Sequence, residues 1–308
     1  MSDIKLFQLN GEIATELGGK SAQLEKDLQN HIESNMEALI GVRFLASEYG
    51  TGKTHKGRID SLGLDENGCP VIVEYKRHSN ENVINQGLFY LDWLLDHQAE
   101  FKWLVMERIG KPAAESIEWG GTRLICIASD FNRYDEHAVQ QINRNIELMR
   151  YRYFGNELLL LELVNAQTVN QAVLAAASAT TKKPSKSNPR DKSQQERLAE
   201  ASTSLLDLYE SACQYVEQLG DEVQRKELKL YTAFKRIRNF VSIVVQPGKD
   251  PRLQMYLKLS GELGEESSFS RDVTHIGHWG TGNLEVNVRT PEDWEKARHL
   301  VDKAYQES

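Results

Sequence analysis

The stretch GRIDSLGLDENGCPVIVEYKR, residues 57–77, decides the fold of the first half of the chain. It contains two short strand-like runs joined by the turn-forming DENG, and so it predicts a hairpin. The run Val-Ile-Val at 71–73 is continuously apolar, which is typical of a strand covered on both faces. Charged residues that follow such a run lie at the rim of a sheet. The stretch therefore predicts a buried hairpin with its charges gathered at one end.

Three charged side chains of this hairpin can share one face. Asp60 enters the first strand and Glu74 lies on the second, so the hairpin can bring both carboxylates together. Lys76 is two residues beyond Glu74, and alternation along a strand places both on one face, with Tyr75 on the other. Two carboxylates beside an ammonium suit a divalent metal and the hydrolysis of phosphodiester bonds. From the residues alone, an ordinary exposed Glu–Lys pair on a half-buried strand stays open.

The segments around the hairpin predict helices that flank a mixed sheet. Apolar residues recur at helical spacing over 22–40, with Ser21 placed as the N-cap. The long apolar run over 81–101 predicts a second helix, and a third is expected over 135–149. Further strands are predicted at 42–50, 122–129, 150–154 and 158–164. This order predicts an α+β fold whose α/β core is a mixed sheet between helices.

GRID at 57–60 and VIVEYK at 71–76, with a spacer of thirteen residues between Asp60 and Glu74, resemble the motif of the PD-(D/E)XK, or restriction-endonuclease-like, nuclease superfamily. Within it the sequence is most similar to the NucS-type and RecB-like branches. In those branches an acidic residue on the first helix precedes the motif, and Glu25 occupies that place here. The resemblance covers about residues 20–165 and departs from the motif at Ile59, where the superfamily name records a proline.

The resemblance implies a role for each matching residue. Asp60, Glu74 and the backbone carbonyl of Tyr75 would hold Mg²⁺ or Mn²⁺, and Lys76 would lie beside the attacking water. Glu25 would act through the outer shell of the metal. The implied activity is metal-dependent cleavage of phosphodiester bonds in DNA by an endonuclease.

Two polar residues of the helix predicted over 81–101 belong to the same resemblance. Gln86 and Tyr90 stand four apart in QGLFY, and this spacing places them on one helical face. The related nucleases have a glutamine and a tyrosine on this helix. The likeness implies that the two side chains support the lysine and a phosphate.

The overall charge does not favour a nucleic-acid partner, so any such contact has to rest on a local basic surface. The chain has 37 Lys and Arg against 45 Asp and Glu, a formal net charge of −8. Lys53, Lys56 and Arg58 precede Asp60, and Arg77 follows Lys76. These cations are predicted to contact a nucleic-acid backbone on both sides of the site. A solvated loop explains the first group of cations equally well.

The second half of the chain is predicted to be a separate domain. Residues 167–195 have few large apolar side chains and many Ala, Ser, Thr, Lys and Pro, the composition of a flexible basic linker. We therefore place a nuclease-like domain at 1–166 and a smaller α+β domain at 196–308, which resembles an uncharacterised bacterial accessory domain. A helix over 196–219, paired strands and a last helix capped by Thr290 are predicted in it.

Several classes of protein are disfavoured by composition. The three cysteines are too few and too far apart for a disulfide framework or a thiolate zinc site. No leader-like start and no apolar run of about 18 residues is present. We expect a soluble cytoplasmic protein with no membrane contact, and homodimerisation is plausible because many related folds pair. The alternative to an enzyme is a catalytically silent module of the same fold that binds nucleic acid or another protein.

Overall fold

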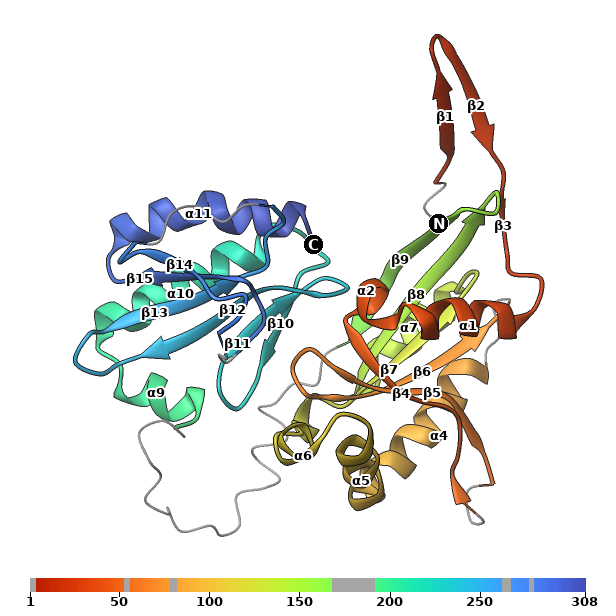
Figure 1. Ribbon diagram of the computed structural model, residues 1–308, viewed down its shortest axis with the longest axis horizontal. Helices are drawn as coiled ribbons and strands as arrows, with labels where there is room; N and C mark the ends of the chain where they lie inside the picture. Colours follow the sequence, from red (N-terminus) through yellow and green to blue (C-terminus); the bar gives the residue numbers. More distant parts are fainter. Residues whose placement is uncertain (1–3, 53–55, 78–81, 168–191, 262–266, 277–279) are drawn as a thin grey trace. The chain divides into compact units, whose positions relative to one another are not determined.

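The computed structural model describes residues 4–52, 56–77, 82–167, 192–261, 267–276 and 280–308 (Figure 1). Its contacts divide the chain into two compact units. Unit 1 comprises Met1–Asp65 with Pro70–Val169, and unit 2 comprises Glu66–Cys69 with Asn170–Ser308. Each unit combines helices with a sheet, so the predicted α+β class is confirmed.

Within its described residues, unit 1 is built on a seven-stranded mixed sheet. Its strands are β3 (Gly19–Lys20), β4 (Val42–Gly50), β5 (Arg58–Asp65), β6 (Pro70–Lys76), β7 (Arg123–Ala128), β8 (Asn145–Phe154) and β9 (Leu158–Gln167). The strand order is β3–β8–β7–β6–β5–β4, and β9 also pairs with β8. β4, β5 and β6 are antiparallel, whereas β6, β7 and β8 are parallel. The predicted hairpin is therefore the antiparallel pair of β5 and β6 within a mixed sheet.

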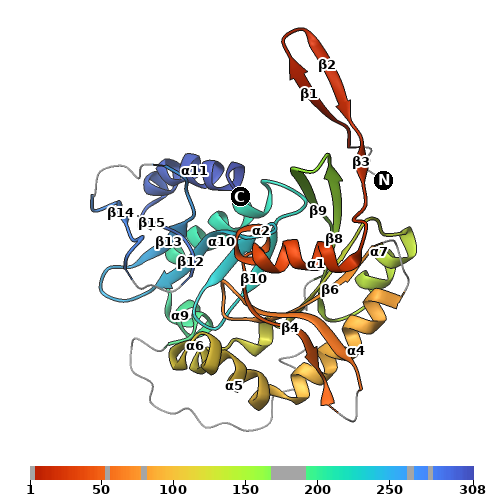
Figure 2. The same ribbon diagram turned by 45° about the vertical axis from the view of Figure 1, so that its right-hand side comes forward.

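Helices cover both faces of this sheet (Figure 2). They are α1 (Glu25–Ser34), α2 (Met36–Ile40), α4 (Asn82–Asp96), α5 (Gln98–Arg108), α6 (Lys111–Glu115), the 3-10 turn η1 (Trp119–Gly121) and α7 (Arg133–Gln140). α4 packs on β6 and β7, where Ile72 and Leu124 join the main core of the unit with Leu91. α1 contacts β5 and β6 from the other face, where Tyr75 is fully buried. Burial on both faces is what the apolar run of β6 predicted.

The predicted helices of unit 1 are shorter in the structure. The helix expected over 22–40 divides at Asn35 into α1 and α2, and α1 follows Leu24 without a side-chain cap, so Ser21 is not its N-cap. The helix expected over 81–101 ends at Asp96 and α5 begins at Gln98. The third expected helix was wrong in its second half. Residues 145–149 belong to β8, because parallel pairing with β7 buries both faces of that segment.

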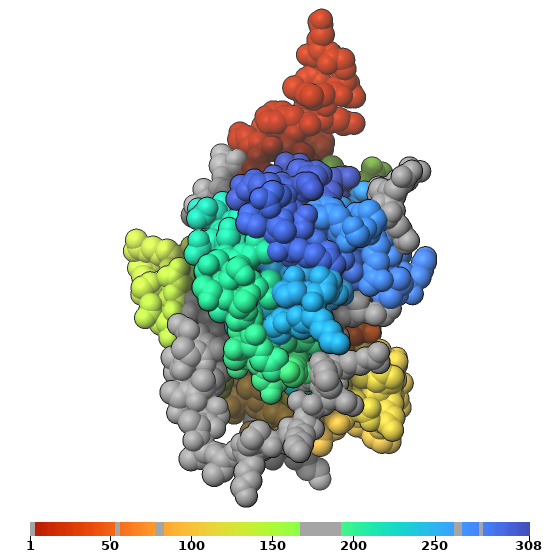
Figure 3. Space-filling model, turned by 90° about the vertical axis from the view of Figure 1, so that its left-hand side faces the viewer, coloured from red at the N-terminus to blue at the C-terminus, as the bar shows by residue number. Residues whose placement is uncertain are grey.

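A hairpin near the N-terminus was not predicted. β1 (Leu6–Asn10) and β2 (Ile13–Leu17) pair antiparallel and form a sheet of their own. Gly11 in the turn has a φ of 63°, a left-handed conformation that glycine adopts readily. The hairpin is a narrow projection, red in Figure 3, and nearly all of its residues are exposed.

Unit 2 has a six-stranded antiparallel sheet in the order β10–β11–β12–β13–β15–β14 among its described residues. Its elements are α9 (Gln194–Glu200), α10 (Thr203–Glu217), β10 (Gln224–Glu227), β11 (Thr232–Lys235), β12 (Asn239–Gln246), β13 (Arg252–Leu257), β14 (Ser270–Asp272), β15 (Leu284–Val288) and α11 (Pro291–Gln306). α10 and α11 pack on this sheet and on each other, and both are visible at the surface in Figure 3. The Thr290 side chain caps α11, as predicted.

The boundaries of the predicted linker differ from the structure at both ends. Gln167 belongs to β9, and α9 begins at Gln194 because Ser193 and Glu196 form a capping box. Residues 168–191 of the predicted linker lie outside the described residues. The helix expected over 196–219 is present as α9 and α10, which are separated at Ala201 and Ser202.

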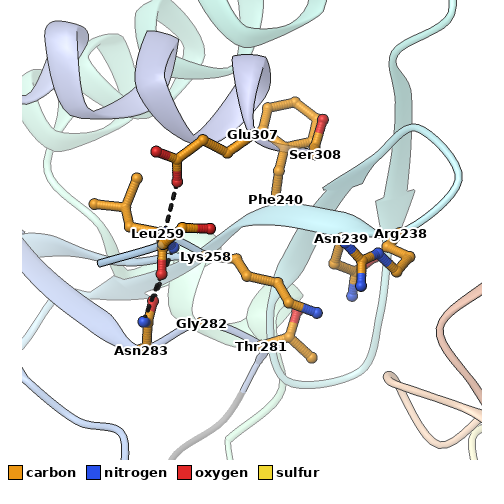
Figure 4. A pocket seen from close by; sticks show the side chains of 11 residues that line it. Arg238, Asn239, Phe240, Lys258, Leu259, Thr281, Gly282, Asn283, Glu307 and Ser308 are labelled. Atoms are coloured by element: carbon orange, nitrogen blue, oxygen red, sulfur yellow. Dashed lines mark hydrogen bonds between the residues drawn. The ribbon is translucent and has the colours of Figure 1, made fainter. Parts of the chain in front are cut away.

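Unit 2 contains a cavity of about 400 Å³ (Figure 4). Lys258, Asn283 and Glu307 contribute polar groups to its lining. Glu307 accepts a hydrogen bond from the Ser260 amide at 2.6 Å, and Asn283 donates to the carbonyl of Leu259 at 2.7 Å. The predicted catalytic residues belong to unit 1 and do not line this cavity. None of the described helices is long and apolar enough to cross a membrane.

Candidate active site

Asp60 and Glu74 meet where β5 and β6 reach the rim of the sheet. The last pair in the β5–β6 register joins Ser61 to Val73, so Asp60 and Glu74 come next on the two strands. The Asp60 amide donates to Oε1 of Glu74 at 3.2 Å, and the Tyr75 amide donates to Oδ2 of Asp60 at 3.0 Å. Each carboxylate is thus held by the backbone of the other strand. The structure brings these two predicted ligands together.

The two carboxylates lie in surroundings that disfavour negative charge. Glu74 is fully buried, and burial together with the neighbouring charge of Asp60 raises its pKa to about 9. Burial also raises the pKa of Asp60, against the opposing effects of the Tyr75 amide and the Lys76 ammonium. Paired carboxylates in such surroundings are stabilised by a proton or by a bound cation. The electrostatics of the pair therefore favour a positive charge between them.

One oxygen of this pair lacks a hydrogen-bond partner. Within the described residues, Oε2 of Glu74 is buried and accepts no hydrogen bond. Leaving such an oxygen unsatisfied is costly, and coordination of a metal ion would remove that cost. No group of three or more His, Cys, Asp and Glu in the described ranges could hold a metal. Mg²⁺ needs only one or two carboxylates because it keeps several of its waters. The residues present fit Mg²⁺ or Mn²⁺ and do not fit a zinc site.

Lys76 extends from the end of β6 to the first turn of α1. Its Nζ donates to Oε1 of Glu25 at 3.1 Å, and the amide of Arg77 donates to Oε2 of the same carboxylate at 3.0 Å. Burial disfavours charge on Lys76, but the hydrogen bond and charge of Glu25 outweigh it and raise the pKa of Lys76. The side chain stays a charged ammonium and is 18% exposed. Glu25 therefore orients Lys76 in this structure.

Gln86 and Tyr90 support the backbone that leads into β5. Nε2 of Gln86 donates to the Tyr90 hydroxyl at 3.3 Å, and the amide of Arg58 donates to the same hydroxyl at 3.2 Å. A Cβ on Gly57 would lie 2.4 Å from Cε1 of Tyr90, so the ring packs directly on this part of the chain. The expectation that Gln86 and Tyr90 support the lysine is not what these contacts show. They hold the segment two residues before Asp60.

Sequence reasoning missed a second group of residues that holds Asp60 from α1. Nε2 of Gln29 donates to the carbonyl of Asp60 at 2.8 Å and to Glu33 at 2.9 Å. The Ser61 hydroxyl donates to Glu33 at 2.6 Å and lies 3.1 Å from the Tyr75 hydroxyl. Gln29 is 4% exposed and stands one helical turn after Glu25. That spacing on one helical face was the signal that could have identified it.

The cations predicted to contact nucleic acid differ in their surroundings. Lys53 lies outside the described residues. Lys56 and Arg77 are exposed, and Lys56 has a left-handed backbone with a φ of 48°. The guanidinium of Arg58 is 69% exposed and forms an ion pair with Glu48, a residue that the sequence had not singled out. Three of the four predicted cations thus have side chains in contact with solvent.

The chain is similar to one protein over nearly its whole length and to solved structures over part of it. The chain matches no protein-family model. It is 28% identical over 305 residues to an uncharacterized protein of Haemophilus influenzae, and the match covers 98% of this chain and 99% of that protein.

Two solved structures resemble part of the chain. One is a repair endonuclease from Pyrococcus abyssi, with 18% identity, 43% of this chain covered and a TM-score of 0.29. The other is EndoMS in a complex with double-stranded DNA, with 18% identity, 46% covered and a TM-score of 0.25. In both cases the chain spans about half of the solved protein, 49% of its length. At this similarity, function has to be argued from the geometry of the site.

Proposed function

We propose that unit 1 is a metal-dependent nuclease that hydrolyses phosphodiester bonds in DNA as an endonuclease. One observation supports this more than any other. The buried Glu74 has a carboxylate oxygen without a partner, directly beside Asp60 and close to the charge of Lys76. Burial of Glu74 and partial burial of Asp60 disfavour the charged carboxylates in the metal-free protein, so their position at the sheet rim needs a functional reason.

Asp60 and Glu74 are the proposed metal ligands. Asp60 and Glu74 would hold Mg²⁺ or Mn²⁺, with the backbone carbonyl of Tyr75 as a further oxygen ligand. The bound ion would neutralise charge on the phosphate and lower the pKa of the attacking water. The chain itself supplies the orientation, since the Asp60 carboxylate is fixed by the Tyr75 amide and its carbonyl by Gln29.

Lys76 supplies a positive charge that does not depend on the metal. Because Glu25 holds its ammonium in place, Lys76 can donate hydrogen bonds to the water or to a phosphate oxygen as negative charge develops there. Such hydrogen bonds stabilise the transition state most where water is excluded, and the Lys76 side chain is mostly buried. Gln86 and Tyr90 would act through the backbone of Gly57 and Arg58, as positioning residues.

The test is incubation of the purified chain with single-stranded, duplex and branched DNA, and with RNA, in Mg²⁺, in Mn²⁺ and in EDTA. We expect cleavage of a DNA substrate that needs the metal and falls by a factor of about 100 or more in Asp60→Ala and in Lys76→Ala. Matched controls are Asp96→Asn and Lys111→Ala, whose side chains are exposed on α4 and α6. Both controls should cut like the wild type.

The alternative is a silent module of the same fold that binds nucleic acid or another protein. Equal inertness of wild type, Asp60→Ala and Lys76→Ala on every substrate, with DNA binding retained, would establish that alternative. Faster cleavage of RNA than of every form of DNA would overturn DNA as the substrate. It would leave the proposed phosphodiester hydrolysis in place. Cleavage that persists in EDTA would overturn the proposed dependence on a metal.

A further inference from the structure

The carboxylate of Glu48, beside the proposed site, forms ion pairs with two cations. Oε1 of Glu48 on β4 lies 3.0 Å from Nζ of Lys26 on α1, and Oε2 forms an ion pair with the Arg58 guanidinium. Two anionic oxygens, each held by a separate cation, reproduce the way a phosphate group is bound by basic side chains. Glu48 thus fills a position in which two non-bridging phosphate oxygens would be recognised.

This cluster adjoins the proposed metal ligands through hydrogen bonds. Lys26 also donates to Oε1 of Gln29 at 3.0 Å, and Gln29 donates to the carbonyl of Asp60. Arg58 is two residues before Asp60 on β5. In the β4–β5 register, the pairs on either side of Glu48 place it opposite Asp60. A phosphate bound here would belong to the same backbone as the bond that is cut.

The backbone of Glu48 is in an unusual conformation for a residue within a strand. Its φ is 53°, in the left-handed region, and the described part of the chain has one other non-glycine residue with positive φ, Lys56. Such conformations are costly and persist where surrounding contacts impose them, often at functional sites. Lys56 is two residues before Arg58, and Glu48 is the ion-pair partner of Arg58.

The ion pairs of Glu48 are weak enough to exchange. The side chains of Lys26, Arg58 and Glu48 are 49%, 69% and 31% exposed, so water and salt screen their attraction. A phosphodiester arriving with further contacts at the site could replace the carboxylate. No large structural change is required, because both cations are already in place.

We propose that Lys26 and Arg58 form a seat for one phosphate of the nucleic-acid backbone, and that Glu48 occupies this seat as an internal competitor in the free protein. This inference rests on the proposed function and names the part of the substrate that the site holds beside the metal. It assigns a binding role to Lys26 and a regulatory role to Glu48.

The test measures binding without cleavage, by fluorescence anisotropy of labelled single-stranded and duplex DNA in Ca²⁺ over a range of salt concentrations. Glu48→Gln should tighten binding about fivefold, because it frees both cations. Glu37→Gln on α2 removes the same charge from an exposed position and serves as the matched control. Lys26→Ala should weaken binding and lower the slope of log affinity against log salt by about one.

The outcomes separate this inference from the proposed function. If Glu48→Gln and Glu37→Gln bind equally tightly, and Lys26→Ala keeps the wild-type salt slope, the phosphate seat is wrong while the nuclease proposal stands. If the wild type binds neither form of DNA, both are overturned. Should Glu48→Gln fail to fold, Glu48→Gly removes the carboxylate and suits the left-handed backbone, and the same tightening is expected of it.

Discussion

Glu74 is the residue on which the proposed chemistry depends most. It is buried on a central strand with one oxygen unpartnered, a position that an apolar side chain would fill at lower cost. Another buried carboxylate of unit 1, that of Glu147, is paired with Arg123 at 2.7 Å. The contrast between these two glutamates supports the proposal that Glu74 binds a cation.

The raised pKa of Glu74 predicts how stability depends on pH in metal-free protein. The pKa is about 9 in the folded state against an ordinary value of 4.5, so the unfolded chain loses this proton at a lower pH. The contribution of Glu74 to stability is therefore complete below the unfolded pKa and is lost as pH rises toward 9. Urea unfolding in EDTA should show this decline.

Two variants check that the decline comes from Glu74. Glu74→Gln cannot ionise and should unfold with a flatter pH dependence over this range. Glu37→Gln, changed at an exposed position, should follow the wild type. Parallel pH dependence in the wild type and Glu74→Gln would show that this carboxyl does not retain its proton on folding.

Gln29 is predicted to matter for rate as well as for stability. Gln29→Ala leaves the Asp60 carbonyl without its Gln29 donor and leaves Glu33 with the Ser61 hydroxyl, at an expected cost of about 1–3 kcal/mol in the free energy of unfolding. Because the backbone of a proposed metal ligand is then free to shift, kcat should fall more than KM rises. Gln98→Ala, at the exposed start of α5, is the control. An unchanged kcat in folded Gln29→Ala would limit Gln29 to a structural role.

Among the elements, β6 was the most predictable. Its apolar run indicated burial on both faces, and alternation placed Glu74 and Lys76 together on one face, apart from Tyr75. The structure has the strand at Pro70–Lys76 between β5 and β7, as such a run requires. Local pattern was sufficient because a central strand imposes the same period on every residue.

Elements whose form depends on distant partners were harder to predict. Residues 145–149 were expected to be helical, and β8 forms there because β7 and β9 pair with it on either side. Glu48 comes opposite Asp60 only after a register shift between Phe44 and Ala46. No local pattern in the sequence encodes that shift, so Glu48 could not have been placed beside the site.

The packing of Tyr90 of α4 against Gly57, just before β5, gives a prediction at the level of elements. Gly57→Ala places a methyl group 2.4 Å from the Tyr90 ring, so the ring or the start of β5 must move. We expect a loss of about 1–3 kcal/mol in stability and a lower cleavage rate, since Gly57 leads directly into the strand that carries Asp60. Gly18→Ala, with nothing within 4 Å of the added carbon, should be neutral in both assays. Equal behaviour of the two alanine variants would mean that Tyr90 does not fix β5.

On the scale of the whole molecule, the proposed chemistry belongs to unit 1 alone. Asp60, Glu74 and Lys76 all lie in it, together with Glu25, Gln86 and Tyr90. Ligand binding to the folded state raises the free energy of unfolding, by about 2.7 kcal/mol at a concentration one hundred times Kd. Mn²⁺ should therefore raise the melting temperature in calorimetry. The shift should vanish in Glu74→Gln and persist in Lys111→Ala, and a shift equal in all three would place the metal elsewhere.

The central claim is that Asp60 and the buried Glu74 together form the centre of a metal-dependent nuclease. Its most direct test is the rate of DNA cleavage by wild type and Glu74→Gln, each measured in Mg²⁺ and in EDTA. We predict cleavage by the wild type in Mg²⁺ only, and a rate at least about 100 times lower in Glu74→Gln at unchanged folding. Cleavage by folded Glu74→Gln at the wild-type rate would contradict the claim.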